Sequence, residues 1–251
     1  MGKKEINRLV LDAAEAYSEN PETAEEFLIS EGIDIDGYVE RGLNDLKSMD
    51  SKPKRKLTKS QSFFRRVVLA ARIADAHHDE RTFGIVKFQK LLFLCEHVCS
   101  MMFYTKYTKQ AAGPMDNRFI HAVKTEFERQ GWFKVQKENK QRSSKVVFIP
   151  LEGINGYRPY YERYYGDTDE AISHVIETFR QWRTEDIELV ATIYSCVEEI
   201  QSEGEEVTEE SVVKRVYDWH KEKEKFNEDK IIRFLKWMSE TGIYPVPGYY
   251  K

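Results

Sequence analysis

Three cysteines and a histidine are the side chains best suited by type to hold a metal ion. Cys95, His97 and Cys99 follow one another at intervals of two residues, and Cys196 lies far along the chain. A structural zinc site takes four ligands. On a helix the two neighbouring sulfurs share one face and the histidine points elsewhere. The spacing therefore predicts no metal site, and we expect the thiols to pack as small apolar groups in the core.

Two further clusters of titratable residues have ordinary structural explanations. Residues 77–80, His-His-Asp-Glu, stand where a helix is predicted to end, a place that favours histidine, and we expect a solvated loop there. Glu222 and Glu224 alternate with lysines, as on an exposed helix face. The chain has no glycine-rich phosphate loop, no nucleophile elbow and no His-Glu-x-x-His motif. We predict no catalytic residue, no cofactor and no enzymatic activity.

Three polar residues, Lys87, Gln89 and Lys90, interrupt the most apolar stretch of the chain. A polar residue on a buried helix must find partners, so we expect Gln89 to satisfy backbone groups near the Gly-Pro turn at residues 113–114. Lys87 and Lys90 are three residues apart and share a helix face. They could cap the same turn, or bind an acidic partner or a phosphate, and we favour the structural role.

Hydrophobic periodicity predicts a chain built mainly of helices. Thr58 and Gln61 fit a capping box at the start of the first helix after the linker. The helices are predicted over residues 62–77, 83–104, 117–130, 168–183, 184–202, 208–225 and 227–241. Residues 132–136 and 145–150 are predicted strands of a hairpin around a polar, mostly basic loop. The fold class is therefore mainly α, a helical core with one small antiparallel β-hairpin placed like the wing of a winged-helix module.

The N-terminal part has short helical patterns but few large apolar residues. Three short helices between Ile6 and Lys47 are too small to be stable alone, and we expect them to dock on the rest of the chain or on another protein. Residues 48–60 have the composition of an exposed linker. The predicted regions are an acidic helical segment (1–50), a basic linker (51–60), a helical core with the hairpin (61–155) and a C-terminal helical region (156–251).

Charge is segregated along the chain. Residues 1–51 hold 5 Lys and Arg against 13 Asp and Glu, residues 52–150 hold 21 against 8, and residues 151–251 hold 13 against 22. Three interpretations stay open. The acidic ends could fold onto the basic centre, the centre could bind nucleic acid through counterion release, or it could bind an acidic protein.

Composition limits the class of protein. With 251 residues, 41% of them hydrophobic, the chain can bury a sizeable core and is not a wholly disordered polymer. No apolar stretch approaches the ~20 residues that span a bilayer, and the N-terminus lacks the apolar region of a signal peptide. Three cysteines are too few for a disulfide framework and indicate a reducing compartment. We expect a cytoplasmic protein without membrane contact.

One stretch carries a family resemblance. The helix VKFQKLLFLCEH is followed, after a short spacer, by KQAAGPMDNRFI, over residues 86–120. These residues resemble the core signature of the Panacea domain, found in the SocA-like antitoxins, and a looser similarity covers residues 62–150. The matching positions are Lys87, Gln89, Lys90, Leu91, Leu92 and Phe93 on the helix and Gly113 and Pro114 at the turn. The chain departs from the pattern at Phe93, where Tyr is usual, and in AAGPMD, which lacks the usual aromatic residue.

The resemblance implies an antitoxin. Proteins of that family bind and neutralise diverse toxins, and one relative delivers its toxin to a protease, roles that need no catalytic centre. The C-terminal part, from Glu188 to Pro245, is similar to tails of bacterial proteins linked to type I restriction specificity subunits. Both resemblances point to conflict systems of bacteria or phages. The predicted function is a non-catalytic, antitoxin-like neutraliser of a toxin or defence-system protein.

The predicted contacts follow from this function. The partner-binding residues are predicted to be Leu9, Val10, Phe27, Leu28, Lys87, Gln89, Lys90, Gly113 and Pro114. An amphipathic N-terminal helix could lie in a groove of the partner. The alternative function is nucleic-acid binding, as a winged-helix-like regulator or restriction-system accessory, through Arg65, Arg66, Lys137, Lys140, Arg142 and Lys145. A pI of about 6.0 argues against a dedicated nucleic-acid binder. Self-association of the chain stays open.

Overall fold

A computed structural model describes residues 57–245, apart from 102, 104, 141 and 142, together with positions 28, 29, 34, 35 and 37. The chain divides into two compact units, residues 1–56 and 57–251, and each is considered by itself. In the first unit Leu28 and Ile29 are helical. Ile35 and Gly37, in the third predicted helix, are also helical. The other residues of the predicted N-terminal helices, and linker residues 51–56, lie outside the described residues.

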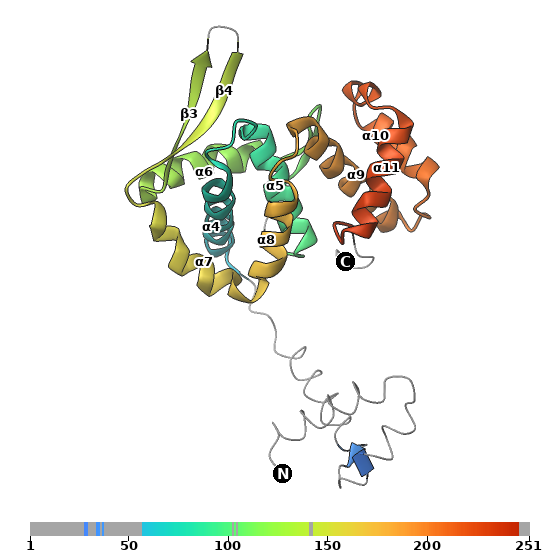
Figure 1. The fold of residues 1–251 in the computed structure, drawn as a ribbon, viewed down its shortest axis with the longest axis horizontal. Coiled ribbons are helices and arrows are strands. Elements are labelled where there is room, and N and C mark those ends of the chain that lie inside the picture. The colour runs from blue at the N-terminus through green and yellow to red at the C-terminus, as the bar shows by residue number, and fades with distance from the viewer. Residues whose placement is uncertain are drawn as a thin grey trace. The chain divides into compact units, whose positions relative to one another are not determined.

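The second unit is mainly helical with a small antiparallel hairpin, which confirms the predicted fold class (Figure 1). Its α-helices are α4 (Lys59–His77), α5 (Ile85–Val98), α6 (Asn117–Gln130), α7 (Arg158–Tyr165), α8 (Asp169–Thr178), α9 (Thr184–Glu203), α10 (Glu209–Trp219) and α11 (Glu228–Glu240). Short 3-10 helices are η1 (Ile154–Tyr157), η2 (Gly166–Thr168) and η3 (Lys221–Lys225). Within the described part of the chain, no helix is both long and apolar enough to cross a membrane.

The hairpin consists of β3 (Phe133–Lys140) and β4 (Ser143–Pro150), and in Figure 1 it extends away from the helices. Val135 lies opposite Phe148, and both side chains are buried. The strands are longer than predicted and the connecting turn is shorter. A second pair of short strands, β1 (Thr108–Gln110) with β2 (Gly113–Met115), was not foreseen from the sequence.

Several helices begin where the sequence predicts, because a capping side chain precedes their first residue. Thr58 and Gln61 form the predicted capping box of α4. Lys59 is consequently the first residue of this helix and not part of the predicted linker. Thr208 and Asn227 cap α10 and α11, each accepting a hydrogen bond from a backbone N–H three residues on. These polar caps satisfy amides that the first helical turn leaves without partners.

Three predicted helix ranges need correction, and one helix was missed. The helix predicted over 168–183 already ends at Thr178, as α8. α5 ends at Val98, because Ser100 has a left-handed backbone (φ 52°) that a right-handed helix cannot continue. The helix predicted over 208–225 breaks at His220, whose backbone is extended, and gives α10 followed by η3. α7 was not predicted, although its buried Tyr161 and Tyr165 stand four residues apart, the spacing of one helix face.

One continuous core joins the two regions predicted to meet at residue 155. α5 packs against α4, α8, α9, β2 and β4, and α9 packs against α10, α11 and β2. The boundary predicted between the core and the C-terminal region therefore runs through a single body. This arrangement places the motif helix, α5, in the middle of the second unit.

Candidate functional site

The two motif lysines, Lys87 and Lys90, are both fully buried on α5. The helix is apolar around most of its circumference, so it lies in the core and carries its few polar side chains inward. A buried ammonium group is costly unless it finds hydrogen-bond acceptors. The two lysines find different acceptors, and each is the centre of a separate polar cluster.

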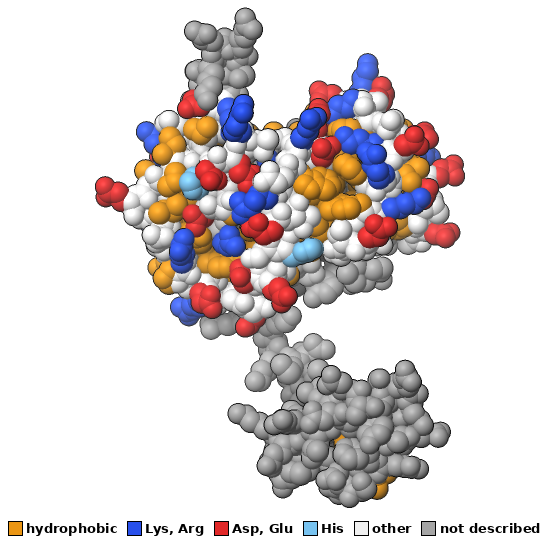
Figure 2. All heavy atoms as spheres, in the orientation of Figure 1, with side chains coloured by type: hydrophobic (Ala, Val, Ile, Leu, Met, Phe, Trp, Pro, Cys, Tyr) orange, Lys and Arg blue, Asp and Glu red, His pale blue; other side chains and the backbone are white. Residues whose placement is uncertain are grey.

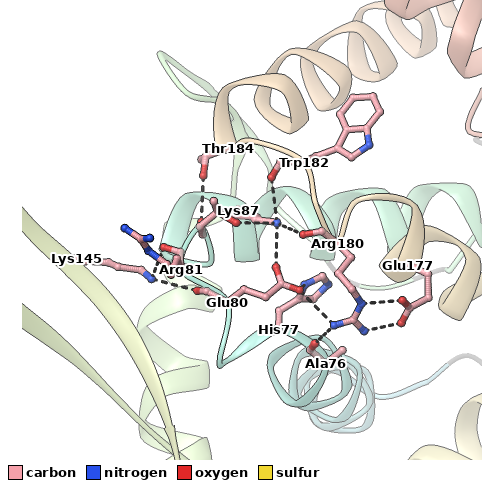
Figure 3. A network of polar contacts seen from close by, with 11 residues as sticks. Ala76, His77, Glu80, Arg81, Lys87, Lys145, Glu177, Arg180, Trp182 and Thr184 are labelled. Atoms are coloured by element: carbon pink, nitrogen blue, oxygen red, sulfur yellow. Dashed lines mark hydrogen bonds and ion pairs between the residues drawn. The ribbon is translucent and has the colours of Figure 1, made fainter.

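The Lys87 cluster joins segments that are far apart in the sequence (Figure 3). The ammonium of Lys87 donates to the carbonyl oxygens of Arg180 (2.8 Å) and Trp182 (3.2 Å), which are 93 and 95 residues further along the chain. It also lies 3.2 Å from Oε2 of Glu80 and from Oγ1 of Thr82. Lys87 therefore fixes the segment between α8 and α9 against the start of α5.

Glu80 is the acidic member of the Lys87 cluster. Its Oε1 lies 2.8 Å from Nδ1 of His77 and 3.3 Å from Nη1 of Arg180, and its Oε2 accepts from Lys87. His77 is fully buried, whereas Asp79 is exposed. The solvated loop expected at residues 77–80 is thus wrong for His77 and Glu80, because three cationic or polar groups converge on the Glu80 carboxylate, and one of them, Arg180, lies 100 residues away in the sequence.

Arg180 and Lys145 extend the Lys87 cluster to further elements. Arg180 donates to the carbonyl oxygen of Ala76 (2.7 Å) and pairs through two nitrogens with both oxygens of Glu177. Lys145 on β4 donates to the carbonyl oxygen of Arg81 (2.7 Å). The cluster consequently ties the end of α4, the start of α5, the α8–α9 segment and the hairpin into one junction.

Burial governs the protonation of this junction. It lowers the pKa of His77 and of Lys87, while the nearby Glu80 carboxylate acts in the opposite direction. A neutral His77 can donate through Nδ1 to Glu80, and its ring stacks on Phe83 with centroids 5.4 Å apart. Nε2 of His77 is buried and has no hydrogen-bond partner among the described residues. The arrangement acts as a polar clamp that holds four segments together.

The Lys90 cluster is separate from the Lys87 cluster and has different acceptors. Nζ of Lys90 donates to the carbonyl oxygen of Pro114 (2.5 Å), so the predicted capping of the Gly-Pro turn is confirmed for Lys90, whereas Lys87 serves the α8–α9 segment instead. On α9, Glu188 pairs with the buried Lys223 at 2.6 Å. Burial, and then the charge of Lys223, lower the pKa of Lys90 to about 7.

A third buried cluster surrounds Arg66 on α4. The guanidinium donates through Nε to Glu96 and through Nη1 to Oδ2 of Asp116 (2.6 Å). Tyr107 donates to the second oxygen of Glu96 (2.8 Å), and Arg66 lies over the ring of Phe119 at 4.0 Å. Arg66, Glu96 and Asp116 are all buried. This Arg66 cluster connects α4, α5 and the start of α6.

The predicted partner-binding residues of the motif lie inside the fold. The buried ones are Lys87, Gln89, Lys90, Gly113 and Pro114. A partner cannot reach them unless the fold opens, so their role is corrected to a structural one. Gln89 also departs from its predicted role, because its Oε1 is buried without a hydrogen-bond partner in the described part of the chain. In the first unit Leu28 is buried, and outside the described residues lie Leu9, Val10 and Phe27.

Those residues predicted to bind nucleic acid that the structure describes do not form one basic surface. Arg66 is buried between two carboxylates, so it is not available to phosphates. Lys145 is half-buried in the Lys87 cluster, Arg65 is half-buried, and Lys137 is exposed on β3. Outside the description lie Arg142 and the side chain of Lys140.

The thiols pack in the core as expected. Cys95 and Cys196 are buried and Cys99 is half-buried. Burial raises the pKa of Cys99 to about 11 and that of Cys196 to about 12, so both are protonated at neutral pH. His97 points toward Glu198, with Nδ1 2.7 Å from its Oε1. No three His, Cys, Asp or Glu side chains are grouped as metal ligands in the residues that the structure describes.

An aromatic cluster at the surface was missed from the sequence. Trp182 lies between α8 and α9, and its ring centroid is 5.5 Å from that of Phe234 and 4.6 Å from that of Trp237, both on α11. All three side chains are half-buried. Figure 2 shows hydrophobic side chains gathered on this face of the second unit, between α8 and α11. The three-residue spacing on α11 was a signal in the sequence, but its pairing with Trp182 depends on the fold.

Comparison of the chain with protein-family models and with curated proteins finds no match. The function therefore has to be argued from the residues themselves. Two features of the second unit carry that argument, the Lys87 cluster inside the fold and the aromatic cluster at its surface.

Proposed function

We propose that this chain is a protein-binding module without chemistry of its own, which neutralises a toxin or a defence-system protein in the manner of an antitoxin. The observation that supports this most directly is the aromatic cluster of Trp182, Phe234 and Trp237. Tryptophan and other aromatic residues are enriched at the centre of protein interfaces, where they supply much of the binding energy.

The Lys87 cluster gives the motif a role in this function. Lys87 holds the carbonyl group of Trp182, and Figure 3 shows the indole ring of Trp182 directed away from the polar cluster. A side chain that is already fixed before binding loses less conformational entropy when a partner arrives. The task that we assign to Lys87 is thus to position a surface residue rather than to touch the partner.

The test is binding to the product of the adjacent gene, produced together with the full chain. We expect co-purification and rescue from toxicity. The double variant Trp182→Ala/Trp237→Ala should weaken binding by at least about tenfold. Tyr160→Ala removes another exposed aromatic side chain, on α7, and should change affinity less than about twofold. Absence of binding and rescue with the unaltered chain would contradict the proposal.

A second candidate, binding of duplex nucleic acid, is favoured by one observation. The order α4, α5, α6 and hairpin resembles a winged-helix arrangement, and Arg118, Lys134 and Lys137 are exposed on α6 and β3. Under this alternative, filter binding would show duplex affinity that falls steeply with salt. Replacing those three residues with alanine would reduce the affinity and flatten its salt dependence, while the tryptophan variant would bind duplex normally.

A further inference from the structure

A groove of about 590 Å³ lies between α10 and α11. Its floor is apolar. Val213 and Tyr217 stand four residues apart on α10, and Ile232 faces them from α11. The hydroxyl of Tyr217 donates to the carbonyl oxygen of Phe226 (2.9 Å), which fixes the ring in the wall of the groove. The floor is therefore a built, apolar surface between two adjacent helices.

The rim of this groove is acidic. Four carboxylates line it, and Lys214 is the one cation among the lining residues that the structure describes. Glu209 is paired with Lys236 at 2.9 Å. In the described part of the chain, the other three, Glu210, Asp218 and Glu228, form no ion pair. Among the described residues, these three carboxylates are thus not neutralised by direct ion pairs, and the rim has an excess of negative charge over Lys214.

We infer that the groove between α10 and α11 binds a basic amphipathic helix of the protein partner, an inference that rests on the proposed function. Two adjacent helices leave a trough into which a third helix can place an apolar face. An apolar floor requires apolar residues at helical spacing. The unpaired carboxylates on the rim require Lys or Arg on either side of that face, and such complementarity selects a basic partner over an acidic one.

The groove and the aromatic cluster share α11. This helix supplies Ile232 to the groove, and it supplies Phe234 and Trp237 to the aromatic cluster. Ile232 and Phe234 are two residues apart and therefore lie on different sides of the helix, so the groove is a second surface separate from the aromatic cluster. The residues of both surfaces belong to the same folded unit, so both are present before the partner binds.

The test uses the full chain and two labelled synthetic peptides. One is an amphipathic helix of leucine, alanine and lysine with leucines at i, i+3, i+4 and i+7, and the other has the same composition in scrambled order. Fluorescence anisotropy should show that the amphipathic peptide binds at least about tenfold more tightly. Equal affinity of the two peptides would overturn the inference, because charge alone would then explain binding.

Matched charge reversals locate the binding. Glu210→Lys/Asp218→Lys reverses two charges of the rim, and Glu222→Lys/Glu224→Lys reverses two exposed carboxylates on η3. We expect at least about a tenfold loss of peptide affinity for the first pair and less than a twofold change for the second. An equal loss in both would overturn the inference. If circular dichroism shows that the first variant is unfolded, Glu210→Gln/Asp218→Asn replaces it, with an expected loss of at least about threefold.

The gene-neighbour product separates this inference from the proposed function. If Glu210→Lys/Asp218→Lys binds that product as tightly as the unaltered chain does, the groove is not the docking site although the proposed function stands. If the unaltered chain binds no such product while both peptide experiments succeed, the proposed function fails and the preference of the groove for a basic helix stands.

Discussion

The charged side chains buried in this protein hold distant segments together. Arg66, Lys87, Lys90 and Lys223 each lie in the interior with acceptors from other elements. A buried ion pair adds little net stability over an apolar pair of the same shape, but removal of one partner leaves an uncompensated charge. Single substitutions at these positions should therefore be far more harmful than substitutions at exposed ion pairs.

Arg66→Met tests this at the most enclosed cluster. The change leaves the carboxylates of Glu96 and Asp116 buried without their cation, so we expect the free energy of unfolding to fall by about 3–5 kcal/mol. The control, Arg158→Met, removes an exposed partner of Asp75 and should cost less than about 1 kcal/mol. Urea unfolding followed by circular dichroism measures both, and equal losses would contradict the assignment.

Lys90 gives the protein a specific pH dependence. Its pKa is about 7 in the folded state against the usual 10.5, so between these values the unfolded chain binds one more proton than the folded chain. The contribution of Lys90 to the free energy of unfolding should rise from about pH 7 to 10 by up to 1.4 kcal/mol per pH unit, and should be constant below pH 7.

Lys90→Met should reduce this slope, because the folded and unfolded chains then bind equal numbers of protons at that position. A smaller slope should remain from Lys87 and Lys223, since burial lowers the pKa of both. Urea unfolding at pH 7, 8 and 9 measures the slope directly. Lys134→Met, which removes an exposed lysine on β3, is the control and should keep the slope of the unaltered chain. A slope in Lys90→Met as steep as that of the unaltered chain would contradict the assignment to Lys90.

At the scale of elements, the close approach of β2 to α9 depends on Gly113. This residue has φ 87°, and a Cβ atom there would lie 2.8 Å from Oγ1 of Thr192. Gly204 has a similar φ of 75°, but in the described structure no atom lies within 4 Å of its Cβ position. Both replacements by alanine carry a left-handed backbone cost of about 1–2 kcal/mol, and Gly113→Ala carries a steric clash in addition.

We expect Gly113→Ala to reduce the free energy of unfolding by at least about 1 kcal/mol more than Gly204→Ala does. Adding Thr192→Ala to Gly113→Ala removes the clashing hydroxyl and should recover part of the difference. Thermal unfolding measures these differences. The variants to compare are Gly113→Ala, Gly204→Ala, Thr192→Ala and Gly113→Ala/Thr192→Ala. Equal losses at the two glycines would contradict the close packing of β2 on α9.

The segment between α8 and α9 should loosen when Lys87 is replaced. Lys87→Met removes the donor that holds the carbonyl oxygens of Arg180 and Trp182, so amide hydrogen exchange in residues 179–184 should accelerate by at least about tenfold. Exchange in α10 should change little. Binding of the partner should also weaken, since Trp182 would no longer be fixed. Unchanged amide hydrogen exchange in residues 179–184 would contradict the positioning role of Lys87.

The elements that the sequence predicts well are those with local signals. Thr58, Thr208 and Asn227 are caps within one turn of the amides they serve, so the helix starts were readable. The acceptors of Lys87 were not, because they are main-chain carbonyls 93 and 95 residues away and no side-chain type marks them. The aromatic cluster was hidden for the same reason, since Trp182 meets α11 only in the folded chain.

At the scale of the whole molecule, residues 57–251 contain 30 Lys and Arg against 30 Asp and Glu. The basic and acidic regions of the sequence therefore cancel within the second unit, whose formal net charge is zero. Some of these charges pair directly across the basic and acidic regions, as Nζ of Lys109 does with Oε2 of Glu199 at 2.6 Å. The excess acidic charge of the chain belongs to residues 1–56.

A chain that begins at Leu57 should fold by itself. Among the residues that the structure describes, the continuous core is formed within this unit, from Val67 to Ile243. We expect the thermal unfolding midpoint of the second unit to change by less than about 2–4 °C, which corresponds to less than about 1 kcal/mol. The same shortened chain tests the predicted partner contacts of Leu9, Val10 and Phe27. If it folds but no longer neutralises the partner, the result supports partner binding by the N-terminal segment that contains these residues.

The three thiols differ in burial, and this difference can be used to study how the fold opens. Only a thiolate reacts readily with an alkylating reagent such as iodoacetamide, and a shielded sulfur must first become accessible. Cys95 on α5 and Cys196 on α9 should react when these two central helices separate, whereas Cys99, just beyond the end of α5, should react during smaller fluctuations. The unmutated protein thus contains three endogenous labelling sites that distinguish local fraying from global unfolding by mass spectrometry.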